Sequence, residues 1–257
     1  MVASGLAALA EEVARDAGAL LRGAFAGARP TTATKTTPTD LVSEADTAAE
    51  ELIRTRLAAV RPEDGILGEE GSDSTGTSGL RWIVDPLDGT TNFLFGIPQW
   101  AVSIAAHDGE RTVAGVVYDP LRDECWSAAA DGEALLDGVP VRGSERSDLA
   151  TALVATGFGY DAGVRAAQGK TVLRLLPRVR DIRRLGSAAL DLAWTAAGRF
   201  DAYYERGLQV WDFAAGALIC ERAGMAVAHL AAAPPAPAGL LVAPAAIIEE
   251  LADLVDP

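Results

Sequence analysis

A change in the spacing of secondary-structure signals near residue 143 constrains the fold more than any other feature of the sequence. Between residues 65 and 142, six short segments rich in strand-forming residues follow one another with turn residues between them. Closely spaced strands of this kind predict a mostly antiparallel sheet. After about Gly143, strand-like and helix-like segments alternate, which is α/β order. We therefore predict two packed halves, an α+β half over residues 1–143 and an α/β half over residues 144–257.

Two amphipathic helices are predicted before the first of these strands, because apolar residues recur there at three- and four-residue spacing. The apolar face of the first helix consists of Leu6, Leu9, Val13, Ala17, Leu20 and Ala24. That of the second consists of Leu52, Ile53, Leu57 and Val60. We expect both helices to cover the antiparallel sheet.

The charge of the chain makes nucleic acid an unlikely partner. It has 36 acidic and 22 basic residues, a formal net charge of −14, and such a surface repels polyanions. No run of about 18 uncharged apolar residues occurs, so no membrane segment is expected. Charged residues from Glu11 to Asp16 interrupt the apolar N-terminal stretch before a signal sequence forms. We therefore expect a cytoplasmic protein.

The cysteines and histidines limit the chemistry of any metal site. Cys125 and Cys220 are the only cysteines and form no C-x-x-C pair, which favours reduced, buried thiols. His107 and His229 are the only histidines, so a site with several histidine ligands is excluded. A metal ion would have to be held by oxygen atoms, which favours magnesium, manganese or calcium.

The stretch RWIVDPLDGTTN is the first candidate for such a site. A short buried strand is predicted to end at Asp85, and Pro86 is expected to turn the chain at once because proline cannot donate to the sheet. The turn would bring the carboxylates of Asp85 and Asp88 together, with the carbonyl of Leu87 between them. Converging carboxylates favour a cation between them. The alternative is an ordinary turn in which Asp85 is a cap and Asp88 is solvated.

The residues that follow add a candidate anion site. Gly89 permits a close approach of the backbone, and Thr90 and Thr91 offer N–H groups where a helix is expected to begin. Metal ligands beside donors for an anion indicate a metal-bridged phosphate site. The alternative is a plain helix start without a ligand.

Three further acidic stretches are candidates, and two of them have a simpler explanation. Glu69 and Glu70 are predicted to end another short strand just upstream. Asp212 precedes a helix, so it can be a plain N-cap. Asp46 stands three residues after Ser43, so the two can form a capping box.

Taken together and in order, the stretches DLVSEAD, GEE, WIVDPLDGTTN and VWDFAAGALICERAG resemble the inositol monophosphatase family. The resemblance extends over essentially the whole chain. The stretch RRLGSAALDLAWTAAGRFDAYYERGLQVWD is similar to the bacterial inositol-1-monophosphatase branch in particular. The resemblance implies one unit over residues 1–257 with layered α-β-α-β-α architecture, the sandwich of the inositol monophosphatase and fructose-1,6-bisphosphatase type, and a homodimer.

The resemblance also implies roles for individual residues. Two to three Mg²⁺ ions would be held by Glu69, Asp85, the carbonyl of Leu87, Asp88 and Asp212, with Glu69 also placing the third ion. Thr90 would act with Asp46 to orient and deprotonate the attacking water. The backbone of Gly89 and Thr90 would bind the phosphate. The inositol would contact Gly186, Ser187, Ala188, Glu205 and Asp212. Glu70 would lie just behind the ligands, and Lys35 would lie on a mobile loop over the site.

The function implied is a Mg²⁺-dependent, lithium-sensitive phosphomonoesterase that hydrolyses myo-inositol 1-phosphate by attack of a metal-activated water. Three alternatives within the same family are phosphatases of histidinol phosphate, 3′-phosphoadenosine 5′-phosphate and fructose 1,6-bisphosphate. A different alternative is a partner-binding role in a larger complex.

Overall fold

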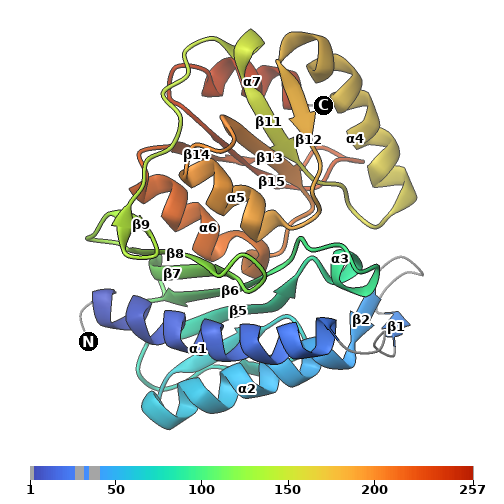
Figure 1. Cartoon of the computed structure of the whole chain (residues 1–257). Helices are drawn as coiled ribbons and strands as arrows, with labels where there is room; N and C mark the ends of the chain where they lie inside the picture. Colours follow the sequence, from blue (N-terminus) through green and yellow to red (C-terminus); the bar gives the residue numbers. More distant parts are fainter. Residues whose placement is uncertain (1–2, 27–31, 35–40, 257) are drawn as a thin grey trace.

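Two long helices form the first layer of the computed structural model, which describes residues 3–26, 32–34 and 41–256 (Figure 1). Helix α1 spans Ala3–Phe25 and α2 spans Glu44–Val60. The predicted faces are largely the buried ones, and Gly18 lets α1 lie close to the sheet because a Cβ there would be 2.5 Å from the ring of Tyr118. The prediction for Val60 is wrong: at the end of α2 its side chain is 56% exposed.

An eight-stranded sheet forms the second layer, in the order β10-β9-β8-β7-β6-β5-β3-β4. All neighbouring strands are antiparallel except β3 and β5, so the prediction of a mostly antiparallel sheet is confirmed. Its strands are β3 (Gly65–Gly68), β4 (Asp73–Ser74), β5 (Arg81–Asp88), β6 (Ala101–His107), β7 (Thr112–Asp119), β8 (Glu124–Ala129), β9 (Ala134–Leu136) and β10 (Val139–Pro140). A separate pair consists of β1 (Thr32–Thr34) and β2 (Leu41–Ser43).

Strand β5 corrects one prediction. The strand does not end at Asp85 but continues to Asp88, and its pairing with β6 shifts register between these two residues. Such an irregularity accommodates Pro86, because a residue that bulges out of the ladder need not donate a hydrogen bond. The chain therefore keeps its direction while the backbone around Leu87 is displaced from the regular ladder.

The remaining layers follow the predicted alternation of strand and helix. Helices α5 (Ala188–Ala196) and α6 (Val210–Arg222) form the middle layer between the two sheets (Figure 1). The second sheet has the order β12-β11-β13-β15-β14 and is mixed, since β11 is parallel to both of its neighbours and β15 is antiparallel to both of its own. Its strands are β11 (Leu153–Thr156), β12 (Asp181–Arg183), β13 (Ala202–Arg206), β14 (Ala226–Leu230) and β15 (Gly239–Ala243).

Helices α4 (Ala162–Leu175) and α7 (Ile248–Val255) cover the outer face of the second sheet and complete the five layers (Figure 1). The predicted α-β-α-β-α architecture is thereby confirmed. The short helix α3 (Thr90–Leu94) follows β5 directly. No helix in the described ranges has the length and hydropathy needed to cross a membrane.

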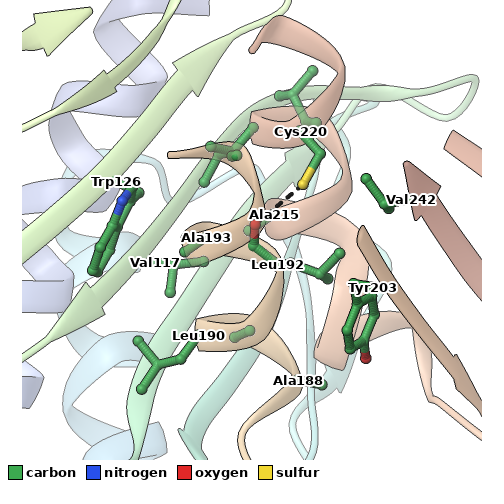
Figure 2. Packing of buried hydrophobic residues seen from close by; sticks show 14 of the residues in the cluster. Val117, Trp126, Ala188, Leu190, Leu192, Ala193, Tyr203, Ala215, Cys220 and Val242 are labelled. Carbon is green, nitrogen blue, oxygen red and sulfur yellow. Dashed lines mark hydrogen bonds between the residues drawn. The ribbon is translucent and has the colours of Figure 1, made fainter. Parts of the chain in front are cut away.

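The middle layer depends on small residues. Figure 2 shows α5 and α6 packed between Trp126 on one side and Tyr203 on the other. Ala215 of α6 meets β7 at Gly115, where an added Cβ would lie 2.9 Å from the backbone of Ala215. Close packing explains why alanine dominates the apolar composition here. Cys220 is buried and free, and its Sγ lies 3.2 Å from the carbonyl of Leu192.

Candidate active site

A cavity of about 410 Å³ lies where β5, α3, α5, β13 and α6 converge. Ten of the predicted residues line it, although they come from both sheets and from helices far apart in sequence. They are Glu69, Asp85, Leu87, Asp88, Gly89, Thr90, Gly186, Ala188, Glu205 and Asp212. The structure thus brings together the residues that the sequence places in four separate stretches.

Four carboxylates share one wall of this cavity. Burial raises the pKa of Asp85 well above its usual range, and the charges of Glu69, Asp88 and Asp212 raise it further. Burial likewise raises the pKa of Asp212, with the charge of Asp88 as the next cause. Each carboxylate therefore makes the ionisation of its neighbours less favourable, and a cation among them would reverse this effect.

Protein donors fix one carboxylate oxygen of Asp85 and one of Asp88. Asp85 Oδ1 accepts from the N–H of Leu87 at 3.0 Å. Asp88 Oδ2 accepts from the Ser187 hydroxyl at 2.5 Å and from the N–H of Ala189 at 2.7 Å. Burial raises the pKa of Asp88 to about 6, although these hydrogen bonds oppose the rise. Side chains held in this way are preorganised before any ligand arrives.

The Asp212 side chain both caps helix α6 and lines the cavity. It is the third residue of α6, and its Oδ2 accepts from the N–H of Gln209 at 2.7 Å in a capping box. The simple interpretation of Asp212 as an N-cap is therefore wrong in position, because Gln209 is the N-cap. Since Asp212 also lines the cavity, the cap serves to aim its carboxylate.

The donor set fits a hard cation by its chemistry. All the candidate ligands are oxygen atoms, and Glu69 lies within hydrogen-bonding reach of Asp85, a distance at which two carboxylates require a shared proton or a cation. Among the described residues, no group of three or more acidic, histidine or cysteine side chains is arranged so that it could hold a metal ion without a change in side-chain position. The fit between this site and a hard cation therefore rests on the oxygen ligands and on the repulsion among the carboxylates, which a cation would relieve.

Thr90 connects the acidic wall to α2. Its hydroxyl lies 2.9 Å from Oδ1 of Asp46 and 3.1 Å from the carbonyl oxygen of Leu87. Asp46 is fully buried in the first turn of α2, so this bond joins residues 44 positions apart. A capping role for Asp46 would not require such a bond. Because the hydroxyl has one proton, donation to Asp46 leaves the oxygen lone pairs of Thr90 available to a ligand.

The backbone at Gly89 adopts a conformation that favours glycine. Its φ is 98°, and an added Cβ would lie 2.9 Å from the carbonyl oxygen of Gln99. Glycine is therefore needed at position 89 so that the backbone can pass close to Gln99. Helix α3 begins immediately afterwards at Thr90, as predicted.

Glu205 of β13 lines the same cavity as the four carboxylates. Its carboxylate packs directly against Gly157 and accepts a hydrogen bond from the hydroxyl of Tyr203 at 3.0 Å. Burial raises the pKa of Glu205 to about 7, and the bond from Tyr203 opposes this rise. The Glu205 carboxylate is thus a hydrogen-bond acceptor that Tyr203 holds in place at the cavity.

A comparison with known families matches residues 3–255 to the inositol monophosphatase family. The chain belongs to the inositol monophosphatase family. Members of this family are phosphatases, so the cavity is the candidate active site of a phosphatase. The family is also generally metal-dependent.

Two relatives and one solved structure illustrate the similarity. Inositol-1-monophosphatase SuhB from Mycobacterium tuberculosis is 46% identical, over 96% of this chain and 91% of its own length. Nus factor SuhB from Xylella fastidiosa is 45% identical, over 72% of this chain and 67% of its own length. The structure of extragenic suppressor protein SuhB from Bartonella henselae has a TM-score of 0.91 at 35% identity and covers 98% of both chains.

Three residues implied by the family resemblance do not line the cavity, and a fourth falls outside the description. Asp46 is hydrogen-bonded to Thr90, which does line the cavity, so its catalytic role stays a prediction. Ser187 is 1% exposed, and its hydroxyl both donates to Asp88 and caps α5, so its inositol contact stays a prediction. Glu70 follows Glu69 outside the cavity lining. Lys35 lies outside the described residues.

Glu50 lies outside the inositol monophosphatase pattern, and it holds the loop that carries Glu69. Glu50 is 4% exposed on α2, and its carboxylate accepts from the N–H groups of Glu70 at 2.7 Å and Ser72 at 2.9 Å. Its position four residues after Asp46 could have indicated this role, since residues at i and i+4 share one face of a helix. One rigid helix therefore positions both Asp46 and the Glu69 loop.

Glu50→Gln should weaken metal binding more than it weakens the fold. The amide NH₂ would face an N–H donor in place of one carboxylate oxygen, so a charge-assisted bond is lost and the Glu69 loop shifts. We expect the half-saturating Mg²⁺ concentration to rise about tenfold or more, on the scale of one lost charged hydrogen bond. Glu51→Gln is the matched control, because Glu51 is exposed and, among the residues that the structure describes, pairs only with side chains of its own helix. Equal metal dependence of the two variants would contradict the positioning role.

Proposed function

We propose that this family member is a Mg²⁺-dependent phosphomonoesterase that hydrolyses myo-inositol 1-phosphate to myo-inositol and phosphate. The observation that supports it best is that Thr90, which is hydrogen-bonded to the buried Asp46, lies beside four repelling carboxylates in one cavity. A phosphate dianion and these carboxylates would repel one another unless cations were present, so this combination fits a metal-dependent phosphatase.

In this proposal two to three Mg²⁺ ions are held by Glu69, Asp85, the Leu87 carbonyl, Asp88 and Asp212. When bound, they neutralise the phosphate and acidify water. The N–H groups of Gly89 and Thr90 bind the phosphate oxygens. Asp88 and Asp212 keep their orientation through the donors of α5 and α6.

The Asp46–Thr90 pair activates the nucleophile. Thr90 donates its proton to Asp46, and its oxygen accepts a hydrogen bond from the attacking water. The proton from the water passes through the Thr90 hydroxyl to Asp46 as the oxygen–phosphorus bond forms. The bond from phosphorus to the alcohol oxygen breaks, this oxygen takes up a proton from solvent, and the alcohol leaves. No covalent enzyme intermediate is required.

Glu205 supports a polyol as the leaving alcohol. Its carboxylate, held by Tyr203, would accept hydrogen bonds from ring hydroxyls, and Gly186 and Ala188 line the same cavity. The name of the Mycobacterium tuberculosis relative agrees with inositol 1-phosphate. By resemblance, the enzyme would act as a cytoplasmic homodimer and would be inhibited by Li⁺.

Glu205→Ala should separate substrate recognition from catalysis. Ring hydroxyls of inositol would lose their acceptor, so kcat/KM for inositol 1-phosphate should fall about ten- to a hundredfold. A simple aryl phosphate has no such hydroxyls and should lose much less. Measuring both substrates on one variant decides the matter. An equal loss on both would mean that Glu205 supports the metal ligands or the fold.

Phosphate release from a substrate panel tests the proposed function. The panel contains inositol 1-phosphate, histidinol phosphate, 3′-phosphoadenosine 5′-phosphate and fructose 1,6-bisphosphate at matched concentrations. We expect the highest kcat/KM for inositol 1-phosphate. A clear preference for any other member would replace the substrate assignment and leave the phosphatase assignment in place.

The Xylella relative gives a reason to keep a second candidate function, because it is named as a Nus factor and not as a phosphatase. In that case the chain would bind a protein partner in a larger complex. A pull-down beside the phosphate-release assay distinguishes the two, since a partner-binding role predicts capture of a stoichiometric complex without turnover.

A further inference from the structure

A second cavity, of about 290 Å³, is separate from the candidate active site but shares the first turn of α6 with it. Val210 and Phe213 of that turn line the second cavity, whereas Trp211 and Asp212 line the active-site cavity. The other lining residues come from the end of β6, the start of β7, the rest of α6 and β14. A volume near the lower limit of roughly 300 Å³ for small-molecule sites predicts a small ligand.

Apolar side chains form one part of this second cavity. Four of the apolar residues that line it are only half-buried: Val210, Phe213, Ala217 and Val227. The ring of Phe213 meets the ring of His229 edge to face, with centroids 6.1 Å apart and an interplanar angle of 69°. A flat apolar group bound here would remove this surface from water.

Nitrogen donors form the other part. Among the described residues, the guanidinium of Arg111 has no hydrogen bond or ion pair. Arg222 donates from Nε to the carbonyl of Gly132 at 2.6 Å, which holds the side chain and leaves its two terminal nitrogens for a ligand. His107 accepts from the N–H of Gly109 at Nδ1, at 3.0 Å, so the neutral ring carries its proton on Nε2 and is a donor there.

The charged side chains of the second cavity favour an anion. Among the described residues that line it, the arginines are Arg111 and Arg222, and the only carboxylate is that of Glu221. The nearby carboxylate of Asp108 lies outside the lining and accepts from the N–H groups of Glu110 and Arg111, at 2.9 Å each. The whole chain has a formal net charge of −14. An anion is therefore better received here than on a surface of the chain's average charge.

We propose that the second cavity is a ligand site for a small aromatic carboxylate. The aromatic ring lies against Phe213, Ala217 and Val227, and the carboxylate accepts hydrogen bonds from Arg111 and Arg222. A planar guanidinium matches the two oxygens of a carboxylate. A single negative charge also matches the excess of one arginine over the carboxylate of the lining. Such a ligand would contact the same helical turn that carries Asp212.

Titration of the whole chain with 2-naphthoate, followed by ligand-observed NMR, tests the proposal. The titrations contain excess chelator, because without cations the acidic wall of the active site repels a carboxylate. We expect saturable binding at one site. The neutral 2-naphthamide should bind at least about tenfold more weakly, the scale of one charged hydrogen bond. Acetate should not bind detectably, because it has no ring.

Two variants change the two parts of the second cavity separately. Arg111→Gln should weaken 2-naphthoate binding about three- to tenfold, less than the loss of a buried charged bond, because Arg111 is exposed. Ala217→Leu should weaken it further, because the larger side chain fills the cavity. Arg178→Gln is the matched control, since Arg178 is exposed and pairs with Glu250 away from the lining. Thermal unfolding shows whether each variant is folded.

The proposal is overturned if wild type shows no saturable binding of 2-naphthoate, or if the acid and the amide bind equally well. It is also overturned if Arg178→Gln weakens binding as much as Arg111→Gln. Light scattering covers the other occupant, a second copy of this chain. A changed oligomeric state in Ala217→Leu, without binding of 2-naphthoate to wild type, would make the cavity a contact between copies and overturn the ligand site.

Discussion

Replacing Asp88 with asparagine should lower the kcat of phosphate release about 10²- to 10³-fold, the loss typical of removing one group that stabilises charge in the transition state. Asp88 shares one wall with three other carboxylates. The substitution removes one negative charge from the ligand set while it keeps the shape of the side chain. The remaining ligands would hold a cation less tightly and would place it less well.

The same substitution should leave the fold intact. The amide oxygen of asparagine can accept the two bonds from Ser187 and Ala189 that Asp88 Oδ2 accepts. Loss of a buried charge also relieves repulsion, because burial and Glu69 both raise the pKa of Asp88. Thermal unfolding should therefore occur at or above the wild-type Tm. Asp131→Asn, an exposed position, is the control for a change of net charge. Near-wild-type turnover in Asp88→Asn would mean that Asp88 is only a turn residue.

Much of the fold could be predicted because its signals are local. The helical spacing of α1, the closely spaced strands from Gly65 onward and the alternation after Gly143 each follow from short stretches of sequence. The stacking of these elements into five layers came from the family resemblance, since local periodicity does not say which faces meet. Val60 shows the limit: its helical position suits burial, but α2 extends beyond the apolar core there.

The errors at the site have a common cause. The sequence predicts that Pro86 turns the chain after Asp85, because proline cannot donate to a sheet, but a register shift after Asp85 accommodates it without ending β5. The local sequence does not reveal whether the neighbouring strand β6 allows such a shift. The sequence offers a cap and a ligand as alternatives for Asp212, whereas its capping bond uses one oxygen and leaves the side chain at the cavity.

Glu50 could not be predicted for the opposite reason: charged residues on a helix usually face water, so their pattern carries little information. Glu50 is buried where the loop after β3 folds back over α2 and offers two N–H groups. Its role depends on a contact between segments that are distant in sequence.

Removal of divalent cations should abolish phosphate release. Without them the substrate dianion would meet Glu69, Asp85, Asp88 and Asp212, whose mutual repulsion already raises the pKa of Asp85. The wall would repel the phosphate, and the Asp46–Thr90 pair would have no phosphate in place to act on. We expect a loss of at least about 10³-fold, consistent with the size of metal contributions to hydrolysis of this kind.

The most direct test of the account is phosphate release from inositol 1-phosphate in excess chelator, followed by titration with Mg²⁺ beyond the chelator. Activity should fall to the background rate and return in full with Mg²⁺, and Mg²⁺ alone should raise the Tm of wild type more than that of Asp88→Asn, because a ligand that binds the native state stabilises it. Undiminished turnover in excess chelator, with no effect of Mg²⁺ on the Tm, would contradict the assignment of the acidic wall as a metal-dependent phosphatase site.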